Sequence, residues 1–389
     1  MQEKIKVGIV GAGFIGPAHI ESLRRLGFVE VVALATSREE TARSKAKALS
    51  IPKAYGNYQE LIKDEEVEVV QITSPNYLHF PQIKAALDAG KHVVCDKPLT
   101  INPRESKILV ELAREKGVVN AVTFNHRFYP LVQQSRAIVQ QGSLGSLYLI
   151  QGGFHQDWLL YDTDYNWRVE SEKGGAVRVV GDIGTHWLDT IQFVTGLKVE
   201  AVFADLGIFI PVRKKPKAAV ETFAGKELKP TDYEEILIDT EDCGIVLLKF
   251  VGASTKGVMT VSQISAGRKC RLFYEIFGAR SALSWDSEKA NQLWMGHRDK
   301  PNEVLIKDPA LMDLSAKKFA RYPGGHTEGF PDSHTQCNRA IYEYIRKEEY
   351  KREIPPDFPT FQTGHEEQLL CEAILESHRR EEWVKIDYS

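Results

Sequence analysis

Residues 5–20 read IKVGIVGAGFIGPAHI, and this stretch decides the fold of the N-terminal part of the chain. Ile5, Val7, Ile9 and Val10 form a short apolar run that is typical of a fully buried parallel strand. Glycines then follow at G-x-G-x-x-G spacing. A helix is expected to begin at once, because Pro17 suits a first helical turn and apolar residues repeat at helical spacing as far as Gly27.

Each glycine of this turn has its own expected role. Gly11 allows the tight turn, Gly13 lets the backbone approach a pyrophosphate, and Gly16 lets the helix pack close to the strand. The pattern alone could be only a tight turn, but its place between a strand and a helix favours nucleotide binding. We therefore expect the turn Gly11, Gly13, Phe14, Ile15 and Gly16 to contact a dinucleotide, with the helix N-terminus facing its negative charge.

The end of the second predicted strand, 29–35, bears on the choice of cofactor. An NAD site usually has an Asp or Glu there to hold the ribose hydroxyl groups, whereas this chain has Thr36, Ser37 and Arg38. Hydroxyl groups and an arginine can bind the 2′-phosphate of NADP. Thr36 and Ser37 would also suit the cap of the next helix. The sequence thus predicts NADP or NAD as the cofactor, with NADP favoured.

Helices and strands alternate as far as residue 124. We expect helices at 39–49, 58–63, 80–89 and 103–116, and strands near Ala54 and at 67–73, 92–95 and 118–123. Such alternation predicts an α/β domain over residues 1–124, a Rossmann-type doubly wound parallel sheet. Ligands of such sheets bind beyond the carboxyl ends of the strands, so the residues that follow each strand are the first candidates for a site.

From about residue 147 the pattern changes to one helix, at 180–195, followed by alternating strand-like segments. These strands are expected at 199–210, 234–239, 244–251, 257–262, 271–277, 282–285 and 291–295. We expect a second, α+β domain over 125–389, with an open, mostly antiparallel sheet and helices on one face. Its lysine- and proline-rich stretch 210–231 is expected to be a surface excursion, and its C-terminal helix, at 362–380, can pack back on the first domain.

Composition narrows the class of protein. The 389 residues suggest two domains, and 50 Lys and Arg against 53 Asp and Glu leave no basic field for nucleic acid. The longest apolar runs have the length of strands and the first residues are not signal-like, so we expect no membrane association and a cytoplasmic protein. Five scattered cysteines without C-x-x-C pairs indicate reduced thiols and no zinc site.

Two further motifs stand out. Lys97-Pro98 follows the predicted strand 92–95, and the segment 181–189 contains Asp182 and His186 at Asp-x-x-x-His spacing. Together with the glycine motif they resemble the Gfo/Idh/MocA family of sugar and polyol oxidoreductases, whose marks are a Glu-Lys-Pro motif and this Asp-His pair. Segments 155–160, 166–168 and 324–329 resemble a subgroup that acts on sugars or anhydrosugars. The resemblance implies an NAD(P)-dependent dehydrogenase acting on a secondary hydroxyl group of a sugar, anhydrosugar or cyclitol.

The resemblance implies that Lys97, Asp182 and His186 are catalytic. Lys97 leaves a strand near the cofactor edge, where its ammonium group could bind the reacting oxygen. Asp182 and His186 share a helix face roughly 6 Å apart along the axis, so the carboxylate could steady an imidazole that acts as general acid or base. They could equally be a capping aspartate and a packed histidine. Since no cluster of ligands joins Asp182, His186 and Asp189, we expect no metal.

The remaining candidates lie after predicted strands or in the family-like segments, and for each of them a turn, a helix cap or core packing is the ordinary alternative. Contacts with the cofactor are expected from Thr73, Ser74, Pro75, Asn76, His79, Asp96, Lys97, Asn125 and Arg127. Contacts with the substrate are expected from Lys97, His126, His155, Asp157, Trp158, Trp167, Arg168, Asp182, His186 and His326, since aromatic faces with polar groups suit a sugar. Asp96 stands where the family has Glu, which shortens the carboxylate beside Lys97 by one methylene group.

Other functions on the same scaffold stay open. A reductase for a dihydrodiol or a biliverdin-like tetrapyrrole would need a less polar pocket, and a regulator that only binds the dinucleotide would not need Lys97, Asp182 and His186 together. Polar and aromatic candidates favour a polyhydroxylated small molecule as the partner. An open sheet covered by helices on one side leaves an apolar face, so we expect a homodimer or homotetramer.

Overall fold

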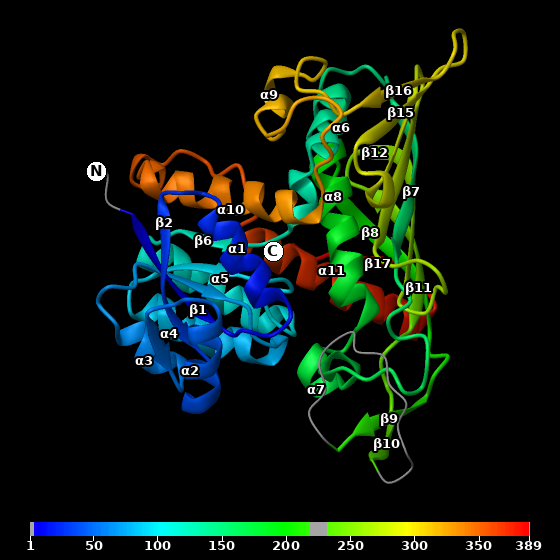
Figure 1. The fold of residues 1–389 in the computed structure, drawn as a ribbon. Helices are drawn as coiled ribbons and strands as arrows, with labels where there is room; N and C mark the ends of the chain where they lie inside the picture. Colours follow the sequence, from blue (N-terminus) through cyan, green and yellow to red (C-terminus); the bar gives the residue numbers. More distant parts are fainter. Residues whose placement is uncertain (1–3, 218–231, 389) are drawn as a thin grey trace. The chain divides into compact units, whose positions relative to one another are not determined.

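The structure is a computed structural model that describes residues 4–217 and 232–388 (Figure 1). The chain divides into two compact units: unit 1 comprises Met1–Asn125 and His334–Gln368, and unit 2 comprises His126–Ser333 and Leu369–Ser389. Residues 334–368, which follow the predicted second domain's sheet in the sequence, therefore belong to unit 1. None of the helices in the described ranges has the length and apolar character that crossing a membrane requires.

Unit 1 is built on a six-stranded parallel sheet, with the strand order β3-β2-β1-β4-β5-β6. The strands are β1 Ile5–Val10, β2 Val29–Ala35, β3 Lys53–Tyr55, β4 Val69–Ile72, β5 His92–Cys95 and β6 Asn120–Val122. The helices between them are α1 Ile15–Arg24, α2 Glu39–Ala48, α3 Tyr58–Lys63, α4 His79–Asp88 and α5 Pro103–Lys116. The predicted doubly wound parallel sheet is confirmed, and its strand order reverses between β1 and β4.

The ends of these helices follow from their capping residues. The side-chain oxygens of Asn57 and Asn102 accept the N–H groups of Glu60 and Glu105, which satisfies backbone donors at the N-termini of α3 and α5. Gly117 ends α5 in a left-handed conformation, with φ of 63°. Polar caps on apolar strand–helix repeats keep each connection short, so the strand ends collect at one edge of the sheet.

Unit 2 contains a nine-stranded sheet in the order β16-β15-β14-β13-β7-β12-β11-β8-β17. Its strands are β7 Leu147–His155, β8 Val199–Gly207, β11 Cys243–Phe250, β12 Ala253–Ser262, β13 Arg271–Gly278, β14 Ala282–Asp286, β15 Gln292–Gly296, β16 Glu303–Ile306 and β17 Val384–Lys385. Only the β7–β12 pair is parallel among the described strand pairs of this sheet, so the predicted mostly antiparallel sheet is confirmed.

Strand β7 lies at the centre of this sheet although its sequence does not predict it. Gly152 and Gly153 weaken the strand pattern there, because glycine is disfavoured in strands. The sheet nevertheless requires both glycines. A Cβ at Gly152 would lie 2.1 Å from the Phe273 carbonyl oxygen, and a Cβ at Gly153 would lie 1.8 Å from that of Thr260. The close approach of the neighbouring strands therefore explains why glycines, which weaken the strand pattern in the sequence, occupy positions 152 and 153.

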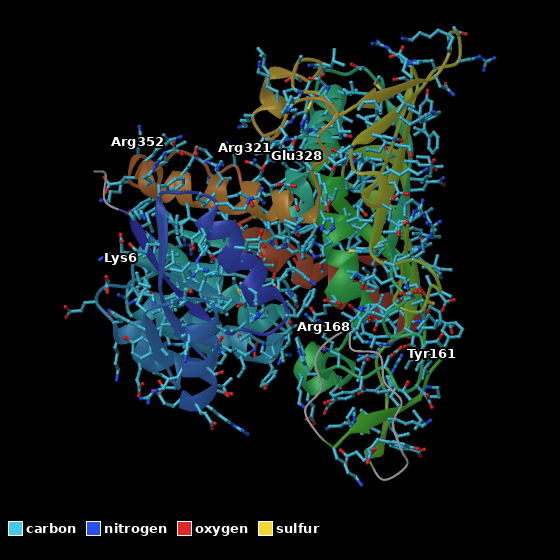
Figure 2. The ribbon with its side chains drawn as sticks, in the orientation of Figure 1. Lys6, Tyr161, Arg168, Arg321, Glu328 and Arg352 are labelled. Carbon is cyan, nitrogen blue, oxygen red and sulfur yellow. The ribbon has the colours of Figure 1, made fainter. Side chains whose placement is uncertain are left out.

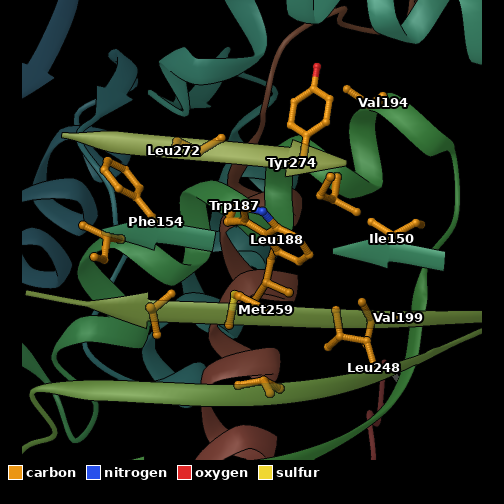
Figure 3. Packing of buried hydrophobic residues seen from close by; sticks show 14 of the residues in the cluster. Ile150, Phe154, Trp187, Leu188, Val194, Val199, Leu248, Met259, Leu272 and Tyr274 are labelled. Atoms are coloured by element: carbon orange, nitrogen blue, oxygen red, sulfur yellow. The ribbon is translucent and has the colours of Figure 1, made fainter. Parts of the chain in front are cut away.

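Helices cover one face of the nine-stranded sheet. Buried side chains of α6 Pro130–Gln140, α8 Thr185–Thr195 and the second half of α11 Phe361–Arg380 share a core with side chains of the strands. Figure 3 shows Trp187 and Leu188 of α8 among Phe154, Met259 and Leu272. The indole Nε1 of Trp187 also donates to the carbonyl oxygen of Phe273 at 2.9 Å. The tight packing and this hydrogen bond hold the start of α8 on the sheet.

The predicted surface excursion at 210–231 differs in part from the structure. Its first part forms β9 Val212–Pro216, which pairs with β10 Tyr233–Leu237 in a separate two-stranded sheet. Arg213 in β9 is fully buried, because its guanidinium group donates to three backbone carbonyls and to Asp242. The rest of the predicted excursion, 218–231, lies outside the described residues.

The other face of the nine-stranded sheet carries exposed apolar side chains. Ile245 and Leu247 of β11 are 53% and 40% exposed, while their neighbours Val246 and Leu248 point into the core. Val304 and Ile306 of the edge strand β16 are exposed in the same alternating way. Because these apolar side chains are exposed on one face of the sheet, we expect a second copy of the chain to cover them.

We predict that Leu247→Glu converts the protein to a monomer, because the substitution places a charge among these exposed apolar side chains. Sedimentation velocity would show a dimer or tetramer for the unmodified chain and a monomer for the variant. Leu311→Glu is the control, since Leu311 is also exposed to solvent, at 65% against 40% for Leu247, but lies outside the strands. A monomeric unmodified chain would contradict the prediction.

Candidate active site

The glycine turn of unit 1 has the geometry that a dinucleotide needs. Gly11 has φ of +98°, and a Cβ there would lie 2.8 Å from the Ser74 nitrogen. A Cβ at Gly16 would lie 2.8 Å from the Gly11 carbonyl oxygen, so helix and strand ends touch through glycine. At Gly13 a Cβ would meet no atom within 4 Å, which leaves the backbone open to a ligand. The turn therefore fits a pyrophosphate at the N-terminus of α1, next to the exposed Phe14.

The end of β2 presents hydroxyl groups and cations. The Thr36 hydroxyl donates to the Arg38 carbonyl oxygen at 2.9 Å, and the side chains of Ser37 and Arg38 are exposed. Lys45 of α2 adds a second cation, because its ammonium group donates to the carbonyl oxygen of Ala12 in the glycine turn. Sequence reasoning missed Lys45, which looks like any surface lysine of a helix. This corner thus combines hydroxyl groups with two positive charges.

The loop after β4 is held from behind by His79. The His79 ring is 1% exposed, with Nδ1 2.8 Å from the Pro98 carbonyl oxygen and Nε2 2.9 Å from that of Ser74. Each ring nitrogen thus lies within hydrogen-bond distance of a backbone carbonyl oxygen. His79 therefore ties the loop after β4 to the loop after β5. Thr73 fixes the same loop to the glycine turn, because its hydroxyl donates to the Gly11 carbonyl oxygen at 2.8 Å.

Asp96 is buried immediately before Lys97. Its Oδ1 accepts the Thr123 hydroxyl at 3.0 Å and lies 3.8 Å from Nε2 of His19 in α1. Burial by itself would raise the pKa of Asp96, but the imidazole of His19 and the positive charges of Lys97 and His79 hold that pKa well below its usual range. Asp96 is therefore ionised. Its side chain is shorter than the glutamate of the family, and the imidazole of His19 from α1 lies beside it.

A polar network fixes the orientation of His19. The amide nitrogen of Gln71 donates to His19 Nδ1 at 2.7 Å and to the Asn338 side-chain oxygen at 3.3 Å. The amide oxygen of Gln71 accepts the Tyr342 hydroxyl at 2.8 Å. Because Nδ1 accepts, His19 carries its proton on Nε2, which faces Asp96. The glutamine within the buried strand VVQI was the available sequence signal for this network.

Asp182 lies in unit 2, in a π-helical turn at Val180–Gly184 that precedes α8. One carboxylate oxygen accepts Nε of Arg168 at 3.2 Å and the other accepts the side-chain amide of Gln263 at 2.8 Å. The Arg168 guanidinium carbon, in the side chain labelled in Figure 2, lies 4.3 Å from the centre of the Trp167 ring. The predicted helix over 180–195 thus begins with a wider turn, a feature common at functional sites. Gln263 was missed by sequence reasoning.

A buried carboxylate holds the chain that leads into this turn. Glu241 accepts the backbone N–H groups of Arg178 and Val180 at 3.0 and 2.9 Å. Burial raises the pKa of Glu241, while these two hydrogen bonds and the charge of Arg178 oppose the rise. The N–H of Asp182 in turn donates to the Arg178 carbonyl oxygen at 2.8 Å. The backbone that leads into Asp182 is therefore anchored on its N-terminal side.

His186 is paired with His126. Their Nδ1 atoms lie 3.1 Å apart, and the ring centres are 4.5 Å apart at an angle of 67°. Both residues are buried: His126 is 2% exposed and His186 is 6% exposed. Phe154 of β7 packs edge-on against His126, with 5.4 Å between ring centres. The expected contact between Asp182 and His186 stays a prediction.

Arg127 forms a two-pronged ion pair within unit 2. Its Nε donates to Asp189 Oδ2 at 2.7 Å, and a terminal nitrogen donates to the other carboxylate oxygen. Burial raises the pKa of Asp189, and the charge of Arg127 opposes that rise. Asn125, the neighbouring candidate, is buried at the end of unit 1. Asn76 is buried and Pro75 half-buried in the loop after β4.

Two other sequence candidates from strand β7 and the loop after it point elsewhere. His155 follows Phe154 in β7, so its side chain lies on the opposite face of the sheet, where Nε2 lies 2.9 Å from the Thr260 hydroxyl. Asp157 accepts the Lys269 ammonium group at 2.6 Å. Neither side chain is brought together with the His126–His186 pair by a contact within the described residues.

Trp158 and His326 also have local surroundings. The Trp158 indole donates to the Gln156 side chain at 2.9 Å, and its ring packs on Leu159 and its neighbours. His326 is exposed in the glycine-rich loop, with Nδ1 3.3 Å from the Gly324 carbonyl oxygen. Glu328 anchors that loop by accepting the Arg321 N–H at 2.9 Å; Figure 2 labels both residues.

No group of three or more His, Cys, Asp or Glu side chains in residues 4–217 and 232–388 is arranged to hold a metal ion. Asp182, His186 and Asp189 therefore do not form a ligand cluster. Their partners are the guanidinium groups of Arg168 and Arg127 and the imidazole of His126.

Two family models match this chain. Residues 5–124 match the model of an oxidoreductase family with an NAD-binding Rossmann fold, and residues 132–284 match the GFO/IDH/MocA C-terminal domain. Levoglucosan dehydrogenase of Pseudarthrobacter phenanthrenivorans is 25% identical over 397 residues, which cover 99% of this chain and 98% of that protein. Trans-1,2-dihydrobenzene-1,2-diol dehydrogenase of Bos taurus is 34% identical over 194 residues, which cover 49% of this chain and 56% of that protein.

A solved structure has the same fold. The structure of a levoglucosan dehydrogenase in complex with NADH and L-sorbose superposes with a TM-score of 0.89, at 23% identity and with 99% of each chain covered. The fold of that structure is therefore shared over nearly the whole of this chain.

We predict that Asp96→Asn lowers the free energy of unfolding of unit 1 by about 2–3 kcal/mol at pH 7, because His19 and Lys97 lose a buried anionic partner. The pKa of Asp96 is depressed in the folded state, so the ion pair stabilises the protein above the ordinary value of 3.8 and this stabilisation is lost as pH falls below it. Urea unfolding measures the unfolding free energies of the unmodified chain and of Asp96→Asn from pH 7 to pH 3. The difference between the two proteins should be constant down to about pH 5 and should shrink below pH 4.

Asp88→Asn is the matched control for this experiment. Asp88 is an exposed carboxylate of α4 that pairs with Lys84 on the surface, so its loss should change the unfolding free energy by less than about 0.5 kcal/mol. Equal stabilities of the unmodified chain and Asp96→Asn at pH 7 would refute the structural role given to Asp96.

Proposed function

This chain belongs to the Gfo/Idh/MocA family of oxidoreductases, and from that premise we propose that it transfers hydride between NAD or NADP and a secondary hydroxyl group of a sugar, anhydrosugar or cyclitol. The enzyme class follows from the family, whose N-terminal model is an NAD-binding oxidoreductase domain. The substrate class is our inference. It is supported by the levoglucosan dehydrogenase relative, which is similar over nearly the whole of both chains.

One observation carries the proposed substrate class: the polar and aromatic groups that unit 2 collects around Asp182. Trp167 offers an aromatic face, while Arg168, Gln263 and Asp182 form a hydrogen-bonded set beside it. Sugars are bound by this mixture, since C–H faces stack on aromatic rings and hydroxyl groups exchange hydrogen bonds with charged and amide side chains. A planar tetrapyrrole would need a broader apolar surface.

The proposed roles of the chain's own residues follow from their chemistry. A bound nicotinamide accepts or supplies the hydride. His186 takes the hydroxyl proton during oxidation and returns it during reduction, as a general base and acid. Lys97 donates a hydrogen bond to the reacting oxygen and stabilises the negative charge that develops there. Asp182 orients substrate hydroxyl groups together with Arg168, and its carboxylate accepts hydrogen bonds from Arg168 and Gln263.

We also propose that the enzyme accepts NADP at least as well as NAD. The end of β2 has Thr36, Ser37 and Arg38 in place of an acidic residue, and Lys45 brings a second cation to the glycine turn. A 2′-phosphate would gain two charge-assisted hydrogen bonds there, whereas an acidic residue would repel it.

The relative from Bos taurus supports a second candidate substrate, a trans-dihydrodiol, because it is 34% identical over half of this chain. A biliverdin-type reductase and a regulator without turnover are less favoured by the polar set around Asp182. A substrate panel distinguishes these candidate functions.

We predict that the enzyme oxidises at least one member of a panel of monosaccharides, inositols, anhydrosugars and a trans-dihydrodiol. The absorbance of the reduced cofactor measures this oxidation. His186→Ala should lower kcat by about 10²–10⁴-fold with unchanged NADH binding, because the proton would have no acceptor. Turnover of a dihydrodiol alone would favour the second candidate. Tight cofactor binding without turnover of any compound would favour a regulator, and near-normal turnover of His186→Ala would remove His186 from the mechanism.

We predict that Arg38→Ala raises the KM for NADP about 10-fold and changes the KM for NAD less than about 3-fold, because a charge-assisted hydrogen bond contributes about 1.5 kcal/mol or more. Lys47→Ala is the control, since Lys47 is an exposed cation of the same helix α2 as Lys45. Initial rates with both cofactors measure the effect. Equal changes in both KM values would show that Arg38 does not read the 2′-phosphate.

A further inference from the structure

The closeness of His126 and His186 places a constraint on their protons. Two Nδ1 atoms 3.1 Å apart in buried rings can share one proton between them. Two protons would bring two N–H groups face to face, and no proton would bring two lone pairs together. One histidine of the pair therefore donates through Nδ1 and the other accepts.

The requirement for a general base selects the donor. If His186 is to take a proton from a hydroxyl group, Nε2 of His186 must carry a free lone pair, so the ring proton of neutral His186 must sit on Nδ1. The shared proton then belongs to His186, and Nδ1 of His126 is the acceptor. His126 in turn carries its own ring proton on Nε2.

We propose that His126 is a positioning residue that holds His186 in the tautomer able to act as a base, an assignment that rests on the function proposed above. During oxidation the hydroxyl proton moves to Nε2 of His186 while the hydride leaves the same substrate carbon for the nicotinamide ring. His186 becomes an imidazolium whose Nδ1–H still donates to His126. No proton has to move between the two rings, and the reverse sequence returns the proton during reduction.

Packing gives His126 the fixed orientation that this role needs. Phe154 packs edge-on against the His126 ring, and Tyr129 lies on another side with 5.8 Å between ring centres. Charged groups on the neighbouring elements have their own partners: Arg127 with Asp189, and Asp182 with Arg168 and Gln263. The carboxylate of Asp182 accepts donors from two other segments, Arg168 and Gln263, and Nδ1 of His186 lies at hydrogen-bond distance from Nδ1 of His126.

Two substitutions separate the hydrogen bond from the packing. In His126→Asn the side-chain oxygen takes the place of Nδ1 and still accepts a hydrogen bond, whereas in His126→Phe the ring remains and the acceptor is lost. Our assignment predicts that kcat falls about 100-fold in His126→Phe and less than about 5-fold in His126→Asn. The KM for the sugar and the affinity for NADH should change less than about 3-fold in both variants. Loss of activity in His126→Asn with retention in His126→Phe would show a packing role and overturn the assignment.

A measurement that needs no turnover keeps the assignment testable if the proposed function fails. In 15N-labelled protein, the His186 signals are identified by their loss in His186→Gln, and their shifts report which ring nitrogen carries the proton. We expect a protonated Nδ1 and an unprotonated Nε2 in the unmodified chain and in His126→Asn, and loss of that preference in His126→Phe. A proton on Nε2 of neutral His186 in the unmodified chain would overturn the assignment, whatever the enzyme turns over.

Discussion

A carboxylate can be buried in a protein only where hydrogen-bond donors replace the water that it loses, and both units of this chain depend on that condition. Asp96 meets it with the hydroxyl of Thr123, with the imidazole of His19 3.8 Å away, and Asp182 meets it with Arg168 and Gln263. Asp242 accepts the N–H groups of Phe209 and Ile210 at 2.7 and 2.8 Å and also binds Arg178 and Arg213. Each carboxylate binds donors from other segments of the chain and so fixes the loops that carry these donors.

The histidines show how partners decide what a side chain can do. An imidazole has two different nitrogens, and its role depends on which of them carries a proton. In His19, Nδ1 accepts from Gln71, so the ring can donate only toward Asp96. In His79, each ring nitrogen lies within hydrogen-bond distance of a carbonyl oxygen, so the ring links two loops. The Nδ1 atoms of His126 and His186 lie 3.1 Å apart, and our proposal assigns the proton between them to His186.

Several residues that the sequence ranked together are separated by the geometry of the sheet. Phe154 and His155 are neighbours in β7, yet Phe154 packs beside His126 whereas His155 lies with Thr260 on the other face. The alternation of a strand makes this unavoidable once the strand is known. Because Gly152 and Gly153 concealed β7 in the sequence, the face on which His155 lies could not be predicted. His79 was similarly expected to face the cofactor, and the structure shows its ring buried between two loops.

The sequence by itself determined the parallel sheet of unit 1, most strands of unit 2 and membership of the family. These features depend on local patterns: apolar runs between turn residues, the glycine motif after β1, and short motifs such as Asp182-x-x-x-His186. Only the tertiary structure decided the partners of the functional side chains. Residues 334–346 join the polar network around Gln71, and His126 meets His186 across 60 positions of the chain. Such contacts depend on how separate elements pack, and a linear pattern carries no record of which buried donor will meet which buried acceptor.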